Sequence, residues 1–590
     1  MKYSDLIADW LVELGYTHCF FLPGGNIMHL LESCSRKFEC VLFVHEGAAC
    51  MAVEYFNAVH PNSKAFALVT AGPGVTNAVT AIAGAYLESR ELLILGGQVK
   101  FTDLARGEVR QRGIQEIDGV ELVRSITESA TRLEDVADAN TFASLIRSGM
   151  SGRKGPVFLE IPLDIQARTV NISTLDKTSV LQPATFNQIA PSTIEELAYK
   201  LRQAKRPVIL IGAGVRWEVA RLLLDKLADR GVPLLVTWNA ADRIPADHPL
   251  YFGRPNIWGQ RYSNILLQQA EVLLALGSRL GLQQTGFNWQ EFVPAGEVVQ
   301  VDCDPAELAK GHPRVMLPIC GDANLVLEQL VGHDLGTHSD WVAFCREVRQ
   351  LLPVVEDVNQ TGTGFVSPYV FMQTLSCLCG SDDIVIPCSS GGAFTVFFQV
   401  FAQKLGQRIL SNKALASMGY GLGGSIGAAM AGVGRRTILI EGDGGFLQNV
   451  QELGTVAANR FNLKLFIFDN NGYASIRMTQ RSYFDGRYVG CDSQTGLGIP
   501  KWKSIFDAYG IPMVDIGPQF EEVPEFQELF KARGPAAFLV RIDPEQTYYP
   551  KITSRITETG GMVSNPLHMM SPDLSPQIAE RVLRHFRDHS

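Results

Sequence analysis

The stretch RRTILIEGDGGFLQNVQELGTVAANRFNLKLFIFDNNGYASIR, residues 435–477, decides the fold. An apolar run ends in a glycine turn around Asp443, a helical stretch follows, and a second apolar run ends at Asn470 and Asn471. Continuous apolar runs, as opposed to alternating ones, are typical of strands buried on both faces of a parallel sheet. The stretch therefore predicts a strand–helix–strand unit of a doubly wound α/β domain.

The same rhythm extends along most of the chain. Apolar runs such as AFALVT, LLILGGQ, PVILIGAG, VLLALGS and AAFLVRID alternate with helical stretches. Two polar stretches rich in turn residues, 167–192 and 351–368, interrupt the alternation and are interpreted as linkers. Because 590 residues are too many for one hydrophobic core, we expect three doubly wound parallel-sheet domains, at 1–175, 190–335 and 365–550. An irregular tail that ends in a short helix should fill 551–590.

Charge and composition narrow the class of partner. A formal net charge of -9 without a long Lys/Arg run argues against nucleic acid or an anionic membrane as the main partner, so we expect small-molecule ligands. The N-terminus lacks the apolar core of a signal peptide, and no run of about 18 apolar residues occurs, which predicts a soluble, cytoplasmic protein. The eleven cysteines are expected to be reduced and mostly buried, and the histidine spacing does not suggest a zinc site.

A cation site is predicted where the two strands of the opening stretch end. Carboxyl ends of neighbouring parallel strands meet at one sheet edge, so Asp443 should lie beside Asn470 and the carbonyl of Gly472. These oxygen ligands suit Mg²⁺, and the helix that starts at the glycine turn offers free N–H groups to a phosphate. The turn glycines are Gly442, Gly444 and Gly445. A glycine-flanked Asp alone is common in turns, but its 27-residue spacing to Asn470 favours a metal diphosphate.

This spacing resembles the GDG…NN motif of the thiamine-diphosphate-dependent 2-keto acid enzymes. The asparagine pair could be Asn470 and Asn471, or Asp469 and Asn470; aligning the Gly-Tyr that follows places the metal ligand at Asn470. The family also requires an acid against the aminopyrimidine ring, which CVLFVHEGAACMAVEYF supplies as Glu46. Taken alone, Glu46 would be an ordinary first-turn helix glutamate stabilised by the helix dipole. Together with the diphosphate motif, the catalytic interpretation is favoured.

Further segments resemble the same family over nearly the whole chain. Gly25 in FFLPGGN is similar to the loop near the reactive carbon, and Pro73 and Asn77 match the pyrimidine-binding domain. The segment LASMGYG implies that Met418 wedges beneath the cofactor and that the Ala416 carbonyl accepts a hydrogen bond from its amino group. The resemblance also places Gly391 and Gly392 next to the cofactor.

The resemblance implies an oligomer. In this family the catalytic glutamate and the diphosphate site come from different subunits, which implies at least a homodimer, and often a homotetramer, with active sites at the subunit interface.

Within the family, the chain looks most like the acetohydroxyacid (acetolactate) synthases. GIQEIDG places Gln115 in the active site and Ile114 at a synthase phenylalanine, while the decarboxylase markers, adjacent histidines and a glutamate at Ile476, are missing. This implies a carboligase that decarboxylates pyruvate and transfers the acetyl unit to a ketone or 2-keto acid. A 2-keto acid decarboxylase or pyruvate oxidase of the same fold, and a catalytically idle cofactor-binding protein, are the alternatives.

The central domain resembles the FAD-binding domain of flavin-containing synthases. Two departures occur, because Gly281 and Gln283 replace an Asp and an Arg of that pattern. Glycine turns after strands are also what any doubly wound domain needs, so both interpretations remain open. The residues that the resemblance assigns to FAD are Gly212, Gly214, Arg254, Gly277, Arg279, Asp302 and Asp322.

Other departures bear on the acceptor. Thr479 replaces the tryptophan that selects the acceptor in the synthases, and Ala393-Phe394 replaces a Gln-His pair. The following stretch, RSYFDGRYVGCDSQTGLGIPKW, carries arginines and tyrosines suited to a larger or anionic acceptor, although it could equally be a solvated surface loop. With PLHMMSP in the tail, the pattern looks most like enzymes that add acetyl to a nucleotide-bound 4-keto sugar.

Overall fold

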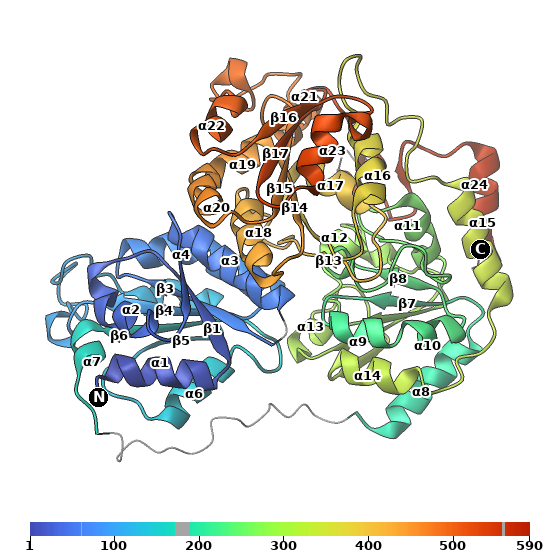
Figure 1. Ribbon diagram of the computed structural model, residues 1–590. Helices are drawn as coiled ribbons and strands as arrows, with labels where there is room; N and C mark the ends of the chain where they lie inside the picture. Colours follow the sequence, from blue (N-terminus) through green and yellow to red (C-terminus); the bar gives the residue numbers. More distant parts are fainter. Residues whose placement is uncertain (61, 172–188, 557–560, 590) are drawn as a thin grey trace. The chain divides into compact units, whose positions relative to one another are not determined.

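The computed structural model describes residues 1–60, 62–171, 189–556 and 561–589 (Figure 1). Residues 172–188 of the first predicted linker lie outside this description. Packing divides the chain into two compact units. The first contains the described residues of Met1–Ala184, Asp382–Ala393 and Leu410–Arg541, and the second those of Thr185–Ser381, Phe394–Ile409 and Ile542–Ser590. The predicted limits of the domains stay predictions.

The first sheet belongs to the first unit and is parallel throughout, with strand order β2-β1-β3-β4-β6-β5. Helices cover both of its faces, as Figure 1 shows for α3 and α4 on one side and α1 on the other. The strands are β1 (Tyr16–Phe21), β2 (Glu39–Leu42), β3 (Lys64–Val69), β4 (Leu92–Gln98), β5 (Ser129–Arg132) and β6 (Pro156–Pro162). The helices are α1 (Tyr3–Glu13), α2 (Met28–Cys34), α3 (Glu46–Val59), α4 (Pro73–Glu88), α5 (Gly119–Val123), α6 (Ala139–Arg147) and α7 (Leu163–Ala167).

A second parallel sheet in the same unit has the order β12-β14-β15-β17-β16. Strands β14 and β15 pair in parallel with Gly442 opposite Phe468, which confirms the strand–helix–strand unit predicted for residues 435–477. The strands are β12 (Ile384–Pro387), β14 (Thr437–Gly442), β15 (Leu463–Asp469), β16 (Met513–Ile516) and β17 (Ala536–Arg541). The helices are α18 (Tyr420–Ala431), α19 (Asp443–Phe446), α20 (Leu453–Asn459), α21 (Ala474–Tyr483), α22 (Trp502–Ala508) and α23 (Pro524–Lys531).

The second unit is built on a five-stranded parallel sheet, β11-β10-β9-β7-β8. With the two sheets above, it confirms the prediction of three parallel α/β sheets. Its strands are β7 (Pro207–Ile211), β8 (Leu234–Val236), β9 (Val272–Leu276), β10 (Glu297–Asp302) and β11 (Leu317–Cys320). Helices in this part of the chain are α8 (Pro191–Gln203), α9 (Trp217–Leu222), α10 (Leu224–Asp229), α11 (Arg261–Gln268), α12 (Leu282–Thr285), α13 (Pro305–Ala309), α14 (Ala323–Leu330), α15 (Ser339–Leu351), α16 (Pro368–Leu378) and α17 (Gly391–Val400), and β13 is Arg408–Ile409.

The tail differs from the irregular segment expected from the sequence. It forms two short antiparallel pairs, β18 (Lys551–Ile552) with β21 (Met570–Ser571) and β19 (Ser554–Ile556) with β20 (Met562–Ser564). Helix α24 (Pro576–Val582) follows. Leu567 and Val582 are buried in the core of the second unit, which anchors the tail. Strands of two or three residues are too short to show a period, so the sequence pattern carries no signal for them.

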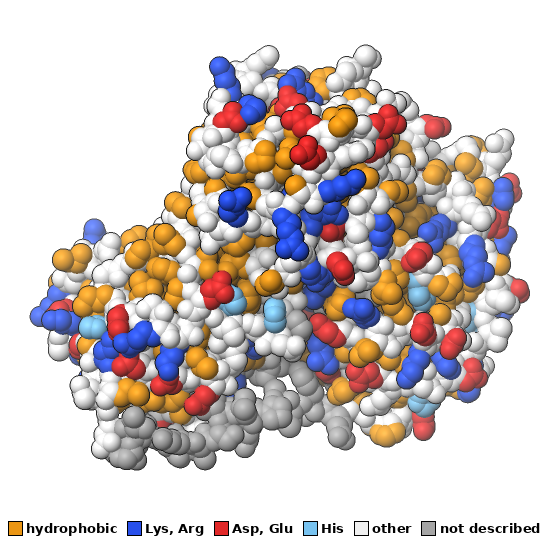
Figure 2. All heavy atoms as spheres, viewed as in Figure 1, with side chains coloured by type: hydrophobic (Ala, Val, Ile, Leu, Met, Phe, Trp, Pro, Cys, Tyr) orange, Lys and Arg blue, Asp and Glu red, His pale blue; other side chains and the backbone are white. Residues whose placement is uncertain are grey.

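Two expectations from composition can be compared with the structure. None of the eleven cysteines forms a disulfide within the described residues, and Cys303, Cys320 and Cys377 are exposed rather than buried. Within the described residues, none of the helices has the length and apolar content needed to traverse a bilayer. On the face drawn in Figure 2, basic and acidic side chains are interspersed.

Helices α3 and α18 pack against each other at very short range, and they lie side by side in Figure 1. Glycines of α18 make this approach possible. A Cβ atom on Gly427 would overlap the carbonyl oxygen of Ala52, and one on Gly424 would stand 2.6 Å from the ring of Tyr55. The backbone of one helix therefore touches the other helix directly, as small residues at a helix interface allow.

We predict that Gly427→Ala lowers the unfolding midpoint by several degrees, because the added methyl must push α18 away from α3. Gly454→Ala is the matched control in helix α20, where the nearest atom to a new Cβ lies at an ordinary 3.4 Å. That control should be neutral or slightly stabilising, since alanine favours helix by about 1 kcal/mol over glycine. Thermal unfolding followed by circular dichroism measures both, and equal midpoints for the two variants would contradict the packing described.

Candidate functional site

Glu46 is the first residue of α3 and follows directly on the segment that leaves β2. Its side chain is buried, with 4% exposed, and its Oε2 accepts a hydrogen bond of 3.0 Å from Nδ2 of Asn77. Asn77 belongs to α4, which begins at Pro73. The structure thus brings together two residues that the family resemblance assigned to the pyrimidine end, Glu46 and Asn77, and Pro73 begins the helix that carries Asn77.

Asp443 lies at the start of α19, immediately after β14, and its side chain is completely buried. Its Oδ1 accepts from the backbone N–H of Gly444 at 2.7 Å. Its Oδ2 accepts from the N–H groups of Asn470 at 3.3 Å and Gly472 at 2.8 Å. The carboxylate therefore binds the loop after β15 to the loop after β14, and the three predicted metal ligands lie at one sheet edge.

The electrostatics of this edge fit a cation. Burial, with a smaller contribution from the nearby charge of Asp469, raises the pKa of Asp443 to about 7, although three backbone N–H groups act to lower it. The side-chain Oδ1 of Asn470 is buried without a hydrogen-bond partner among the described residues. Burial disfavours the charged form of the Asp443 carboxyl group, and the amide oxygen of Asn470 has no hydrogen-bond partner among the described residues. A hard cation would stabilise the carboxylate and bind the amide oxygen as a ligand. The described residues contain no cluster of three or more His, Cys, Asp or Glu, so the candidate ligand set is a mixed one.

The glycines around Asp443 have distinct surroundings. Gly442 faces open space, whereas a Cβ on Gly445 would stand 3.0 Å from Oε1 of Glu441 and one on Gly444 would overlap the ring of Tyr473. The open position at Gly442 and the first turn of the helix leave room for a phosphate near the backbone N–H groups. Gly472 has φ +117 and packs on the carbonyl of Cys491.

Glu441 is a buried acid that the sequence interpretation did not select. Burial raises its pKa to about 8, although the N–H groups of Gly419 and Leu422 donate to it. Its Oε2 has no partner among the described residues. Glu441 thereby holds the N-terminus of α18 against the end of β14. A charged residue at the end of an otherwise apolar strand was the available signal.

Arg477 was also missed. This buried residue of α21 donates from Nη2 to the carbonyl of Asn470 at 2.8 Å, and its Nη1 lies 3.7 Å from Oδ2 of Asp492. Gly472 and Asp492 form an isolated bridge, and Asp492 caps its own turn through Thr495. Arg477 therefore fixes the loop that presents Asn470. A single arginine in an amphipathic helix gives no sequence signal for this role.

The segment before α18 has an unusual backbone at Ala416. Ala416 has φ +55, and Ser389 donates a hydrogen bond to the carbonyl of Ser417. The half-buried Met418 has its Sδ 3.9 Å from Nε2 of Gln448. Gly391, with φ +82 and open space around it, begins α17 together with Gly392.

The pyrimidine end and the cation edge belong to the same compact unit of one chain. The carboxylate of Glu452 accepts from the N–H groups of Val44, at 3.2 and 3.3 Å, and His45, at 2.9 Å, just before Glu46. Asn449 donates to the carbonyl of Gly419 at 2.8 Å. The family resemblance implies that the two ends of one active site come from different subunits, and contact between these segments within one chain does not test that arrangement. The subunit arrangement stays a prediction.

Gln115 and Gly25 are placed near the pyrimidine end but at its exposed side. Gln115 is exposed with φ +63, and its carbonyl packs on Gly72, which precedes Pro73. A methyl group added to Gly25 would meet no atom within 4 Å, so the space in front of this glycine is open. The carboxylate of Glu46 is hydrogen bonded to Asn77 and to neither of these two residues within the described chain.

The seven residues assigned to FAD all lie in the second unit. Most of them already contact other residues of the chain. A Cβ on Gly214 would stand 2.8 Å from Cα of Gly277, so these two glycine loops pack on each other. Gly212 is closed in by the same loop. Asp322 caps α14 by accepting from the N–H of Asn324 at 2.8 Å. The glycines are thus explained by close packing without a flavin.

Of the remaining FAD candidates, two have side chains that are hydrogen bonded to the chain, and one has no side-chain partner among the described residues. Arg254 is buried and hydrogen bonded to the chain, as described below, and Asp302 accepts from the N–H of Asp304 at 3.0 Å. Arg279 is half-buried and is the one of the seven whose side chain has no partner among the described residues. Among these seven candidates, Arg279 is therefore the main side chain left to bind a flavin.

Comparison with known proteins gives matches to the thiamine pyrophosphate enzymes. The thiamine pyrophosphate enzyme models match as the N-terminal TPP binding domain at residues 1–122, the central domain at 194–330 and the C-terminal TPP binding domain at 390–540. Thiamine pyrophosphate (TPP) is thiamine diphosphate.

Curated relatives span almost the whole chain. Over 555 residues the chain is 27% identical to the acetolactate synthase isozyme 1 large subunit of Escherichia coli (strain K12), covering 93% of this chain and 95% of that protein. It is 28% identical over 564 residues to a probable acetolactate synthase large subunit of Methanocaldococcus jannaschii, covering 92% and 93%. It is 27% identical over 570 residues to the chloroplastic acetolactate synthase 1 of Zea mays, covering 94% and 87%.

We predict that Arg477→Met raises the Mg²⁺ concentration needed for half-saturation about tenfold, because the Asn470 loop loses its support. Calorimetric titration of Mg²⁺ in the presence of thiamine diphosphate measures this. Arg481→Met, at an exposed position one turn later on α21, is the matched control and should bind as the unaltered protein does. Arg477→Lys should recover part of the affinity. Unchanged Mg²⁺ binding by Arg477→Met would show that the loop holds itself.

Proposed function

The chain belongs to the acetolactate synthase-like thiamine diphosphate enzymes, which form carbon–carbon bonds, and from this premise we propose that it decarboxylates pyruvate and transfers the acetyl unit to a ketone or 2-keto acid. The observation that carries the proposal is the pairing of Glu46 with Asn77 in the unit that also holds Asp443 and Asn470. One end supplies a buried acid and the other a cation edge, as the two ends of thiamine diphosphate require.

When bound, thiamine diphosphate supplies a nucleophilic carbon for the keto group and stabilises the charge left after loss of CO2. The chain's own residues prepare this. Asn77 fixes one carboxyl oxygen of Glu46, so the other oxygen is free to hold or move a proton at the aminopyrimidine edge. Asp443, Asn470 and the Gly472 carbonyl would hold Mg²⁺ against the diphosphate.

Ligation is favoured over aldehyde release by an apolar residue. Ile476, at the position of a decarboxylase glutamate, lies on α21 with 48% of its surface exposed and cannot donate a proton. Because Ile476 would supply no proton at that position, the site would favour transfer to a second carbonyl group over release of an aldehyde.

We expect Glu46→Gln to reduce pyruvate consumption at least about 100-fold while Mg²⁺ and thiamine diphosphate still bind, because the amide cannot exchange the proton. Glu525→Gln is the matched control, since Glu525 is also a first-turn helix glutamate, on α23, but is exposed. Purified protein is incubated with pyruvate, thiamine diphosphate and Mg²⁺, and products are identified by mass spectrometry. A ligated five-carbon acid supports the proposal.

Other products would replace the proposal with a named alternative. Free acetaldehyde without ligated product indicates a decarboxylase, and hydrogen peroxide indicates an oxidase. Bound cofactor with no pyruvate turnover in either the unaltered protein or Glu46→Gln indicates an idle cofactor-binding protein.

For the acceptor we propose an anionic molecule of the nucleotide 4-keto sugar class. The support is the loop of residues 105–116, whose backbone is organised by the buried carboxylate of Glu116. That carboxylate accepts from the N–H of Ala105 and, at 2.9 Å each, from those of Arg112 and Gly113. Arg110 and Arg112 of this loop are exposed, as is Gln115 in the same loop. Arginine side chains suit the oxygens of a diphosphate.

The double variant Arg110→Gln/Arg112→Gln should weaken inhibition of ligation by UDP or dTDP about tenfold or more, because the charge facing the diphosphate is lost. Ligation of pyruvate to uncharged acetone should keep its rate. Arg124→Gln, an exposed arginine on the same domain paired with Glu121, is the control. Equal inhibition of all three proteins would exclude this loop as the anion-binding element.

Three further properties remain predictions of the sequence. FAD binding would rest mainly on Arg279, and visible flavin absorbance of the purified protein would support it. A homodimer or homotetramer with shared active sites would show as restored activity when Glu46→Gln is mixed with a variant of Asp443. A cytoplasmic location is the third.

A further inference from the structure

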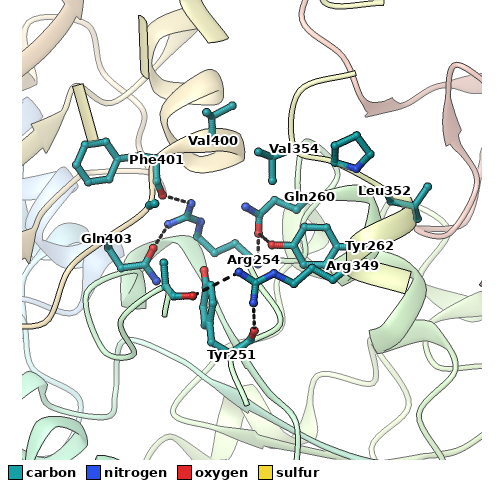
Figure 3. Close-up of a pocket in the computed structure, with 13 residues that line it drawn as sticks. Tyr251, Arg254, Gln260, Tyr262, Arg349, Leu352, Val354, Val400, Phe401 and Gln403 are labelled. Carbon is teal, nitrogen blue, oxygen red and sulfur yellow. Dashed lines mark hydrogen bonds between the residues drawn. The ribbon is translucent and has the colours of Figure 1, made fainter. Parts of the chain in front are cut away.

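A cavity in the second unit has no part in the proposed active site. Its volume is about 320 Å³, and it is formed by three segments, 246–262, 349–354 and 400–403 (Figure 3). All of its lining residues belong to the second unit, whereas Glu46 and Asp443 belong to the first. Its size lies at the lower end of the range for small-molecule sites.

One wall of the cavity carries a buried cation. Arg254 is only 1% exposed. Its Nε donates to the carbonyl of Phe398 at 2.8 Å, its Nη1 to Oε1 of Gln403 at 3.0 Å, and its Nη2 to the carbonyl of Phe401 at 2.6 Å. All three acceptors are neutral, and no carboxylate of the described residues pairs with this guanidinium. A buried charge that lacks a counter-charge is unfavourable, so the site favours an anion.

A second cation lines the same cavity. Arg349, near the end of α15, donates from Nη1 to the carbonyl of Tyr251 at 3.1 Å, and its Nη2 lies 3.5 Å from the carbonyl of Ala246. It too has no carboxylate partner among the described residues. The two arginines act on a common neighbour: burial raises the pKa of Tyr262, and the charges of Arg349 and Arg254 oppose that rise.

The cavity also contains an unused hydrogen-bond donor and an apolar wall. The hydroxyl of Tyr251, a residue 2% exposed, has no partner among the described residues. Figure 3 shows its ring standing next to Arg349. The remaining lining includes Leu352, Val354 and Val400, which offer no polar side-chain group.

We propose that this cavity binds a small organic monocarboxylate with a branched or aromatic apolar body. The carboxylate lies between Arg349 and Arg254 and accepts from the hydroxyl of Tyr251, and the apolar body contacts the aliphatic wall. This combination of a few convergent polar groups with apolar lining is typical of ligand sites. The site is separate from pyruvate turnover, so the proposal does not depend on the proposed function.

The test is a binding titration of the full-length protein by calorimetry and thermal shift, without turnover. Isovalerate and phenylacetate are the probes, and isovaleramide and phenylacetamide are their neutral counterparts. We expect saturable binding and a raised unfolding midpoint with the two acids only. Arg349→Gln should weaken binding about tenfold or more, because a charge-assisted contact is lost.

Two variants separate this site from general effects. Arg346→Gln removes an exposed arginine one turn earlier on α15, which does not line the cavity, and should leave binding unchanged. Tyr251→Phe should weaken binding several-fold while the ligand-free protein unfolds at the same or a higher temperature, because the buried hydroxyl has no partner to lose among the described residues.

The proposal is overturned if neither acid binds, if the amides bind as well as the acids, or if Arg349→Gln and Arg346→Gln bind equally. Inorganic phosphate that binds as tightly as the acids would also overturn it, since the apolar wall would then contribute nothing.

Discussion

The carboxylate of Asp443 is completely buried, receives three backbone N–H groups, and yet has a pKa raised by its burial. Its negative charge is unfavourable in that position unless a cation accompanies it. The rest of the site follows from this constraint. The loop after β15 is drawn to the loop after β14 by the same carboxylate, and Arg477 then holds Asn470 from behind. The structure is thus arranged around a charge that the protein alone leaves uncompensated.

Within one chain, backbone packing as well as polar contacts positions the helix that begins with Glu46. The α18 glycines let α3 approach until backbone and ring atoms touch, and α3 begins at Glu46. Glu452 adds a polar tie by accepting from the two N–H groups that precede Glu46. The acid and the cation edge therefore belong to a single packing unit, whose geometry is fixed by small residues and a few buried carboxylates.

The sequence predicted those structural features that leave a periodic pattern or a fixed spacing of residues in the chain. The strands around Asp443 were recognisable from their continuous apolar runs, and the meeting of Asp443 with Asn470 followed from the rule that parallel strand ends share an edge. Glu46 was selected only through family resemblance, because a first-turn glutamate has an ordinary explanation. Long-range polar contacts left no such trace. Arg477 occupies a common position in an amphipathic helix, and its partners are a carbonyl and an acid that the fold, rather than a local pattern, brings to it. Arg254 was assigned to a flavin by its motif, but only the folded chain shows that carbonyl oxygens surround it.

The contact between Gly427 and Ala52 has a genetic consequence. The atom that a new methyl would strike is a main-chain carbonyl, which every amino acid possesses, so no exchange at position 52 could make room for it. A second mutation that compensates for a substitution of Gly427 would have to lie elsewhere and shift a whole helix. A selection for restored stability should therefore yield mostly reversion to glycine. The constraint at this pair of positions is therefore one-sided: residue 52 can vary in side chain as its surroundings permit, whereas any side chain at residue 427 destabilises the packing of the two helices.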